Sequence, residues 1–274
     1  VQNMSFPFFE IERHAEQRTA TLWLNRPDKK NLMNWDFWDD LPKVVAELEA
    51  DPEVRAIVIA GRGESFSIGI DFKDFFVQMG ELFQNKTAES REELYHKIKK
   101  MQAGFIAIDE AKKPYIAAVH GYCIGAGLDL IAACDLRVAS QDAIISLRET
   151  KVGIVADIGS LQRLPYIIGE GHTKYMAYTG RDFGAEECQR MGLLNELHTT
   201  AEATLTAAHN LAAEIAANPA MIIRGVKHNL NYSRDHTINE GKDYVALYNS
   251  SLLDNADLHE AIAAFFEKRV PKFR

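Results

Sequence analysis

Residues 114–165 read PYIAAVHGYCIGAGLDLIAACDLRVASQDAIISLRETKVGIVADIGSLQRLP, and the organisation of the whole chain follows from them. The apolar run 115–119 lies between a proline and a glycine and predicts a short buried strand. A glycine-rich turn at 125–127 leads into the apolar run 128–133, which predicts the start of a helix. A second apolar region, 136–147, ends just before Glu149.

Three acidic residues lie in this region, each in apolar or glycine-rich surroundings: Asp129, Glu149 and Asp157. Carboxylates in such surroundings have raised pKa values, and raised pKa values suit proton transfer near neutral pH. Taken one at a time, each acid is equally consistent with a helix cap or a charge at a strand end. Three of them in one apolar region favour a site for acid–base chemistry.

Composition excludes several classes of protein. The chain has 274 residues, of which 47% are hydrophobic and 26% charged, which is typical of a globular protein. A net charge of −8 without a basic run argues against nucleic-acid binding. The three cysteines form no C-x-x-C pair, so we expect no zinc site and no disulfide framework. No apolar run is long enough to span a membrane and no signal peptide is evident, so we expect a cytoplasmic protein.

The remaining pattern predicts one α/β domain, with a core over 1–200 and a helical region over 201–274. We expect strands at 8–13, 19–24 and 56–61, a helix from 34 that Pro42 bends or restarts, and a mobile polar loop at 79–92. A helix with its apolar face at 95–108 follows that loop, and the helix at 161–178 should break near Gly169. Four C-terminal helices are expected at 201–217, 220–232, 238–253 and 256–268.

Two glycine-containing junctions are candidates for backbone hydrogen-bond donors. The first junction is 66–71, where the N–H of Ile70 lies just before an expected helix, and the second is 125–127, where the N–H of Ala126 lies at the start of another. Amides at the beginning of a helix have no acceptor within that helix. If both point at one atom, they form an oxyanion hole; the alternative is a pair of ordinary helix N-termini. The glycine turn is not a dinucleotide-binding fingerprint, because Leu130 occupies the position of the third glycine.

These motifs together resemble the enoyl-CoA hydratase/isomerase (crotonase) superfamily. The resemblance rests on FSIGID at 66–71, AAVHGYCIGAGLDL at 117–130, ACDLR at 133–137 and LQRLP at 161–165, with LNRP at 24–27 and FFEKR at 265–269. Within the superfamily, the tracts 155–165 and 231–236 are most similar to the Δ3,5-Δ2,4-dienoyl-CoA isomerases.

The resemblance implies a spiral of ββα units with a helical C-terminal trimerisation region, assembled as a homotrimer or homohexamer. It implies that Ile70 and Ala126 donate to the thioester oxygen, that Asp129 and Glu149 stand where hydratases carry two glutamates, and that Asp157 is a third acid similar to that of the isomerases. It further implies a group of residues around the coenzyme A portion of the substrate: Ile68, Gly69, Asp71, Phe72 and Gly125. Lys29 is a candidate for a different reason: coenzyme A is negatively charged, so an acidic protein needs local cations to bind it. No metal and no cofactor other than the coenzyme A of the substrate are expected.

The implied activity is a step of fatty acid β-oxidation, in which 3,5-dienoyl-CoA becomes 2,4-dienoyl-CoA. A proton must leave C2 and another must reach C6, so the two acids should be separated along the acyl chain; Glu149 and Asp157 are the candidates, with Asp129 tuning Glu149. Two alternatives remain open: a 2-enoyl-CoA hydratase in which Asp129 and Glu149 flank a water molecule, and a non-catalytic acyl-CoA-binding protein.

Overall fold

The computed structural model describes residues 6–273; residues 1–5 and 274, which the predicted ranges 1–200 and 201–274 include, lie outside the described part. A six-stranded sheet in the order β1-β2-β3-β4-β6-β9 forms the centre. Its first pair is antiparallel and all later pairs are parallel. The strands are β1 (Phe9–His14), β2 (Thr19–Leu24), β3 (Ala56–Gly61), β4 (Tyr115–Val119), β6 (Leu136–Ser140) and β9 (Glu196–His198).

A smaller sheet lies beside the first. Its strands are β5 (Tyr122–Ile124), β7 (Ile144–Ser146) and β8 (Phe183–Gly184), in that order. Two isolated bridges hold the segment after β3: Ser67 pairs with Cys123 of β5 in this sheet, and Ile70 pairs with Met33, which precedes α1 (Trp35–Ala50). Successive turns of the chain thus bring the glycine-containing segments on either side of β4 together.

The central sheet is covered on both faces. Alternate residues of β3 point to opposite sides: Ile57 and Ile59 belong to the larger core, and Ala56, Val58 and Ala60 to a second one. The larger core includes side chains of α1 (Trp35–Ala50), α3 (Ala88–Asp109), α4 (Ala126–Ala133), α5 (Ser160–Thr179) and α6 (Ala185–Arg190). Helix α7 (Ala201–Ala216) covers the other face.

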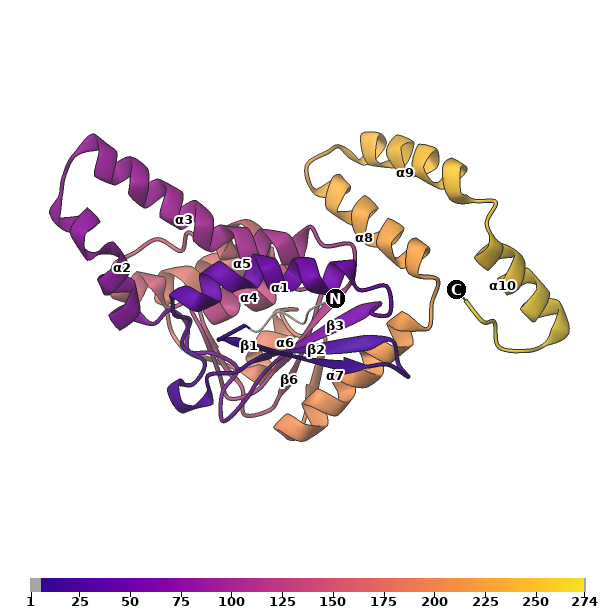
Figure 1. Ribbon diagram of the computed structural model, residues 1–274, viewed down its shortest axis with the longest axis horizontal. Helices are drawn as coiled ribbons and strands as arrows, with labels where there is room; N and C mark the ends of the chain where they lie inside the picture. Colours follow the sequence, from indigo (N-terminus) through magenta and orange to yellow (C-terminus); the bar gives the residue numbers. More distant parts are fainter. Residues whose placement is uncertain (1–5, 274) are drawn as a thin grey trace.

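Three further helices extend away from this body (Figure 1). They are α8 (Ala220–Arg234), α9 (Ile238–Leu252) and α10 (Ala256–Glu267). Helix α10 carries Phe265 and Phe266, which are 78% and 77% exposed in the single chain. The α/β class and the helical C-terminal region are confirmed, whereas the division at residue 200 stays a prediction. Within residues 6–273, no helix combines the length and apolar character that a membrane span requires.

The structure corrects two local predictions. The segment 79–92 is not a loop: α2 (Phe72–Gln84) continues to Gln84 and α3 begins at Ala88, where Thr87 and Ser90 form a capping box. The end of α2 and the beginning of α3 are polar because this pair of helices projects from the body, as Figure 1 shows. Helix α1 also continues through Pro42 without restarting, since its apolar face is anchored in the core. The predicted break in α5 is confirmed at Gly169, with φ +76°.

Candidate active site

The segment 67–70 lies alongside 122–126. Ile124 N–H donates to Ser67 O and Ser67 N–H donates to Tyr122 O, both at 3.0 Å. Gly69 has φ +90°, and a Cβ at this position would lie 2.8 Å from Ile124 O. Only glycine therefore permits both the backbone conformation and this close approach of the two segments.

Two backbone amides in this contact have no acceptor among residues 6–273. Met33 N–H donates to Gly69 O at 2.8 Å and Asp71 N–H donates to Met33 O at 3.0 Å, which leaves Ile70 N–H unused between them. Ala126 is the first residue of α4, so its N–H has no intrahelical acceptor. A Cβ on Gly69 would lie 3.5 Å from Ala126 N, so the two segments that carry these amides are adjacent.

Glu149 brings a carboxylate to the same place. It begins the 3₁₀ helix η2 (Glu149–Val152) and is half-buried. Gly125 precedes Ala126 with φ +55°, and a Cβ there would lie 3.1 Å from Glu149 Oε1. The other oxygen, Oε2, is buried and has no hydrogen-bond partner among the described residues. Burial, and then the charge of Asp157, raise the pKa of Glu149.

Asp129 lies deeper, in the first turns of α4, and its side chain is fully buried. Ser160 N–H, at the start of α5, donates to Oδ1 at 2.6 Å, while Oδ2 has no partner among the described residues. Burial, followed by the charge of Glu149, raises the pKa of Asp129 to about 7, against the opposing effect of the Ser160 hydrogen bond. This carboxyl can therefore change protonation near neutral pH.

Asp157 is more exposed than the other two acids, although its sequence neighbours are apolar or glycine. It lies in the loop between η2 and α5, and the residue is exposed. Partial desolvation still raises its pKa. The Gln102 side chain of α3 donates to the Asp157 backbone oxygen at 2.6 Å and ties this loop to α3. The three acids thus form a series from the buried Asp129, through Glu149, to the solvent-open Asp157.

Two charged residues near the glycine segment are engaged within the protein. Asp71 caps α2 by accepting from Asp74 N–H at 3.3 Å, and it pairs with Arg26 at 2.7 Å. Burial alone would raise the pKa of Asp71, but the hydrogen bond from Arg26 and those from backbone amides lower it overall. The Asp71 carboxylate is thus occupied by internal partners, and the Arg26 charge is engaged in the same ion pair. The expected contact of Asp71 with substrate stays a prediction.

The other predicted coenzyme A residues lie around this segment. Ile68 N–H donates to Lys30 O at 3.2 Å, which places the loop carrying Lys29 beside Ile68. Lys29, the last residue of η1 (Pro27–Lys29), and Phe72 at the start of α2 are both exposed. No cluster of three or more metal-ligating side chains occurs within residues 6–273.

Sequence reasoning missed three supporting residues, Gln102, Ser160 and Arg163. Gln102 and Ser160 contact the acids through backbone groups, which no side-chain pattern reveals. Arg163 belongs to the LQRLP motif, but the motif does not identify the carboxylate with which Arg163 forms an ion pair. The structure pairs it with Asp109, 54 residues earlier in the chain.

Comparisons with known proteins show the family to which this chain is related. The family model described as "Enoyl-CoA hydratase/isomerase" matches residues 14–274. The chain is 37% identical to the peroxisomal Delta(3,5)-Delta(2,4)-dienoyl-CoA isomerase of Arabidopsis thaliana over 96% of this chain and 95% of that protein. It is 38% identical to the mitochondrial Delta(3,5)-Delta(2,4)-dienoyl-CoA isomerase of Mus musculus over 94% of this chain and 79% of that one.

Solved structures show the same fold. Pseudomonas aeruginosa DspI superposes with a TM-score of 0.88 at 29% identity, covering the whole of both chains. An enoyl-CoA hydratase from Bacillus anthracis gives a TM-score of 0.88 at 26% identity, over 97% of this chain and 98% of that one. The predicted crotonase-like fold is confirmed.

These relatives also overturn one prediction. A cytoplasmic location was expected, but the similar dienoyl-CoA isomerases are named as mitochondrial or peroxisomal proteins, so that expectation is wrong. The family model spans nearly all of the chain, and the named isomerases match it at more than a third identity. The chain belongs to the enoyl-CoA hydratase/isomerase family.

Proposed function

We propose that this protein is a Δ3,5-Δ2,4-dienoyl-CoA isomerase acting in fatty acid β-oxidation. Family membership supports an acyl-CoA thioester as substrate, and the similar isomerases support the dienoyl compound. The observation that carries the chemistry is the placement of the Glu149 carboxylate against Gly125, directly beside the unused N–H of Ala126. A base next to a free amide donor is the arrangement that enolate chemistry needs.

In the proposed reaction, the N–H groups of Ile70 and Ala126 bind the thioester oxygen. Ionised Glu149 removes a proton from C2, and the electron pair spreads over C2–C6 and the oxygen. The two amides stabilise the negative charge that develops there, an effect worth about 10²–10³ in rate for each donor in comparable sites.

Asp157 then delivers a proton to C6, so the double bonds move from C3=C4 and C5=C6 to C2=C3 and C4=C5. The reaction ends with Glu149 protonated and Asp157 ionised, and proton exchange with water restores both. Asp157 is exposed without substrate, but an apolar acyl chain lying over it would displace water and raise its pKa further. The charge of Glu149 raises the pKa of buried Asp129, and in this proposal Asp129 in turn orients or tunes Glu149.

The proposal extends to binding and assembly. The residues that border the coenzyme A portion, which is part of the substrate, are Ile68, Gly69, Asp71, Phe72, Gly125 and Lys29, and no further cofactor takes part. Exposed apolar side chains on α8–α10 support a homotrimer or homohexamer.

The experiment supplies the protein with a 3,5-dienoyl-CoA and follows the conjugated 2,4-diene by ultraviolet absorbance. Asp157→Asn and Glu149→Gln should each lower kcat by about 10²–10⁴, the usual contribution of a general acid or base. Asp142→Asn, an exposed acid in the β6–β7 turn, is the matched control and should retain full activity.

Three results would contradict the proposal. Faster hydration of 2-enoyl-CoA than isomerisation of the diene would favour the hydratase alternative. Thermal stabilisation by acyl-CoA without turnover of either substrate would favour a non-catalytic binding protein. An unchanged rate in Asp157→Asn would remove this residue from the role of C6 donor.

A further inference from the structure

The turn 157–160 involves two of the three acidic residues, Asp157 and Asp129. Asp157 begins it, and Ser160 at its end donates to Asp129. Between them, Gly159 has φ +130°, a conformation that side chains rarely adopt. A Cβ on Gly159 would also overlap Nη1 of Arg163, so the guanidinium lies directly over this glycine. The shape of the turn thus depends on where Arg163 is held.

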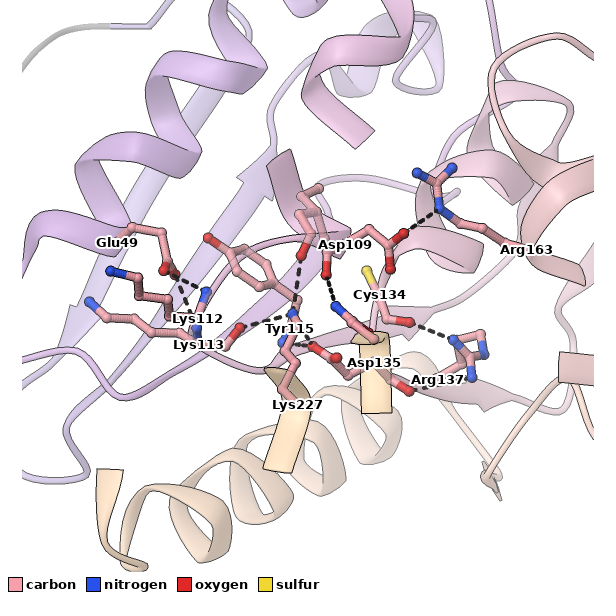
Figure 2. A network of polar contacts seen from close by, with 12 residues as sticks. Glu49, Asp109, Lys112, Lys113, Tyr115, Cys134, Asp135, Arg137, Arg163 and Lys227 are labelled. Atoms are coloured by element: carbon pink, nitrogen blue, oxygen red, sulfur yellow. Dashed lines mark hydrogen bonds and ion pairs between the residues drawn. The ribbon is translucent and has the colours of Figure 1, made fainter. Parts of the chain in front are cut away.

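Asp109 holds Arg163 from the other side, and Figure 2 shows its carboxylate facing the guanidinium. Asp109 is the last residue of α3, and its Oδ2 accepts from Arg163 Nε at 3.2 Å. Its Oδ1 accepts from Arg234 Nη1 at 2.8 Å, and its backbone oxygen accepts from Asn231 Nδ2, also at 2.8 Å. Both of these partners belong to α8, so one aspartate joins α3, α5 and the first of the extending helices.

This connection borders a cavity on one side of the turn, whereas the buried Ile158 side chain packs into the larger core. The cavity has a volume of about 680 Å³ and is lined by Ile158 and Gly159 of the turn on one side and by Leu230 and Arg234 of α8 on another. A cavity offers no atoms to hold a backbone segment in place. Arg163 is only 12% exposed at its side chain, so its pairing with Asp109 is screened less than a surface pair.

We infer that Arg163, fixed by Asp109 and through it by α8, is a positioning residue that sets the placement of Asp157 and Asp129. The inference rests on the proposed isomerase function. Displacing a catalytic group by about 1 Å can cost about 10²-fold in rate, so a loose turn would affect catalysis more than substrate binding. The Arg163 charge also acts on Asp129, whose other charged neighbour is Glu149, and it lowers the pKa of that buried carboxyl.

The test measures kcat, KM and the pH profile of kcat for Arg163→Gln, Arg163→Lys and Asp109→Asn. Arg163→Gln should lower kcat by about 10- to 100-fold with little change in KM, and should move to higher pH the part of the kcat profile that follows Asp129. Arg163→Lys keeps the charge, so its pH profile should stay at the wild-type position although kcat falls. Asp109→Asn should also lower kcat, because it frees Arg163 while leaving the cation in the protein.

The matched control is Lys174→Gln, which removes an exposed cation from an ion pair on the same helix, away from the turn. It should leave kcat and the pH profile unchanged. The inference is overturned if Arg163→Gln and Asp109→Asn retain wild-type kcat, or lose activity only in proportion to the folded fraction with an unchanged pH profile. An active wild type with these results leaves the proposed function standing, whereas an inactive wild type refutes both.

Discussion

The Oε1 atom of Glu149 lies 3.1 Å from the point that a Cβ on Gly125 would occupy. Gly125 also has φ +55° and ψ −119°, which disfavours every residue with a side chain. Gly125→Ala should therefore push the carboxylate away from the Ala126 amide and strain the backbone by about 1–3 kcal/mol. We expect a loss of kcat of about 10²-fold, measured by the diene absorbance assay.

Gly80→Ala is the control for that substitution. Gly80 lies within α2 and an added Cβ there meets nothing within 4 Å. The change should leave kcat unaltered and raise the free energy of unfolding by about 0.4–1 kcal/mol, because alanine restricts the unfolded chain. Equal activity in Gly125→Ala and Gly80→Ala would show that the Glu149 position does not depend on Gly125.

The buried Asp129 should make stability depend on pH. Its pKa rises from 3.8 to about 7 on folding, so the folded state binds this proton more tightly than the unfolded chain. Stability contributed by the protonated carboxyl is present below pH 3.8 and is lost as the pH rises to about 7. Asp129→Asn keeps an acceptor for Ser160 N–H without the charge, and should be more stable than wild type at pH 8 by at most about 4 kcal/mol.

Urea unfolding at several pH values measures this difference. The advantage of Asp129→Asn should shrink steadily as the buffer is acidified toward pH 4. A constant difference between pH 4 and pH 8 would mean that Asp129 does not titrate differently in the folded and unfolded states.

Catalysis should show its own pH dependence. Glu149 must be ionised to accept the C2 proton, and burial raises its pKa above the ordinary 4.5. The acid limb of kcat should therefore fall at a pH higher than 4.5, and the alkaline limb should follow deprotonation of Asp157, whose pKa is also raised. A rate that stays constant from pH 4.5 upward would contradict this assignment of base and acid.

Local motifs were enough to predict the centre of this site. Glycines at 69 and 125 are required by backbone geometry, so their spacing in the sequence already indicates where two segments meet and where free amides lie. Asp129 and Glu149 stood out because charged residues are rare in apolar runs. The exposure of Asp157 was not predictable, since it depends on how far its loop lies from the core rather than on its sequence neighbours.

Long-range polar contacts were also beyond the sequence. Asp109 meets Arg163 54 residues away and Arg234 125 residues away, and any surface aspartate would have the same local pattern. The α2–α3 helices were missed for a related reason: a projecting helix has few buried positions, so the apolar periodicity that indicates helices is weak there. Their capping residues, Thr87 and Ser90, were the available signal.

A second polar contact fastens α8 to the core through Lys227, shown in Figure 2. Its Nζ donates to Asp135 Oδ2 at 2.8 Å and to the backbone oxygens of Ile108 and Lys113, and the side chain is only 7% exposed. Burial raises the pKa of Asp135 and the Lys227 charge opposes that rise. Lys227→Met should therefore destabilise the protein by about 3 kcal/mol, because it leaves the Asp135 charge without its partner. This value is the lower end of the range for breaking a buried ion pair, since the Asp135 side chain is 26% exposed to solvent.

Measuring the free energy of unfolding at neutral pH tests this prediction. Lys174→Met is the control: it removes an exposed ion pair with Glu170, which should contribute less than about 1 kcal/mol to stability. The loss in Lys227→Met should diminish in buffers acid enough to protonate Asp135, since the unpaired charge then disappears. A second substitution, Asp135→Asn, should restore part of the stability at neutral pH for the same reason. If Lys227→Met and Lys174→Met unfold at the same urea concentration, the Lys227 ion pair does not hold α8 against the core.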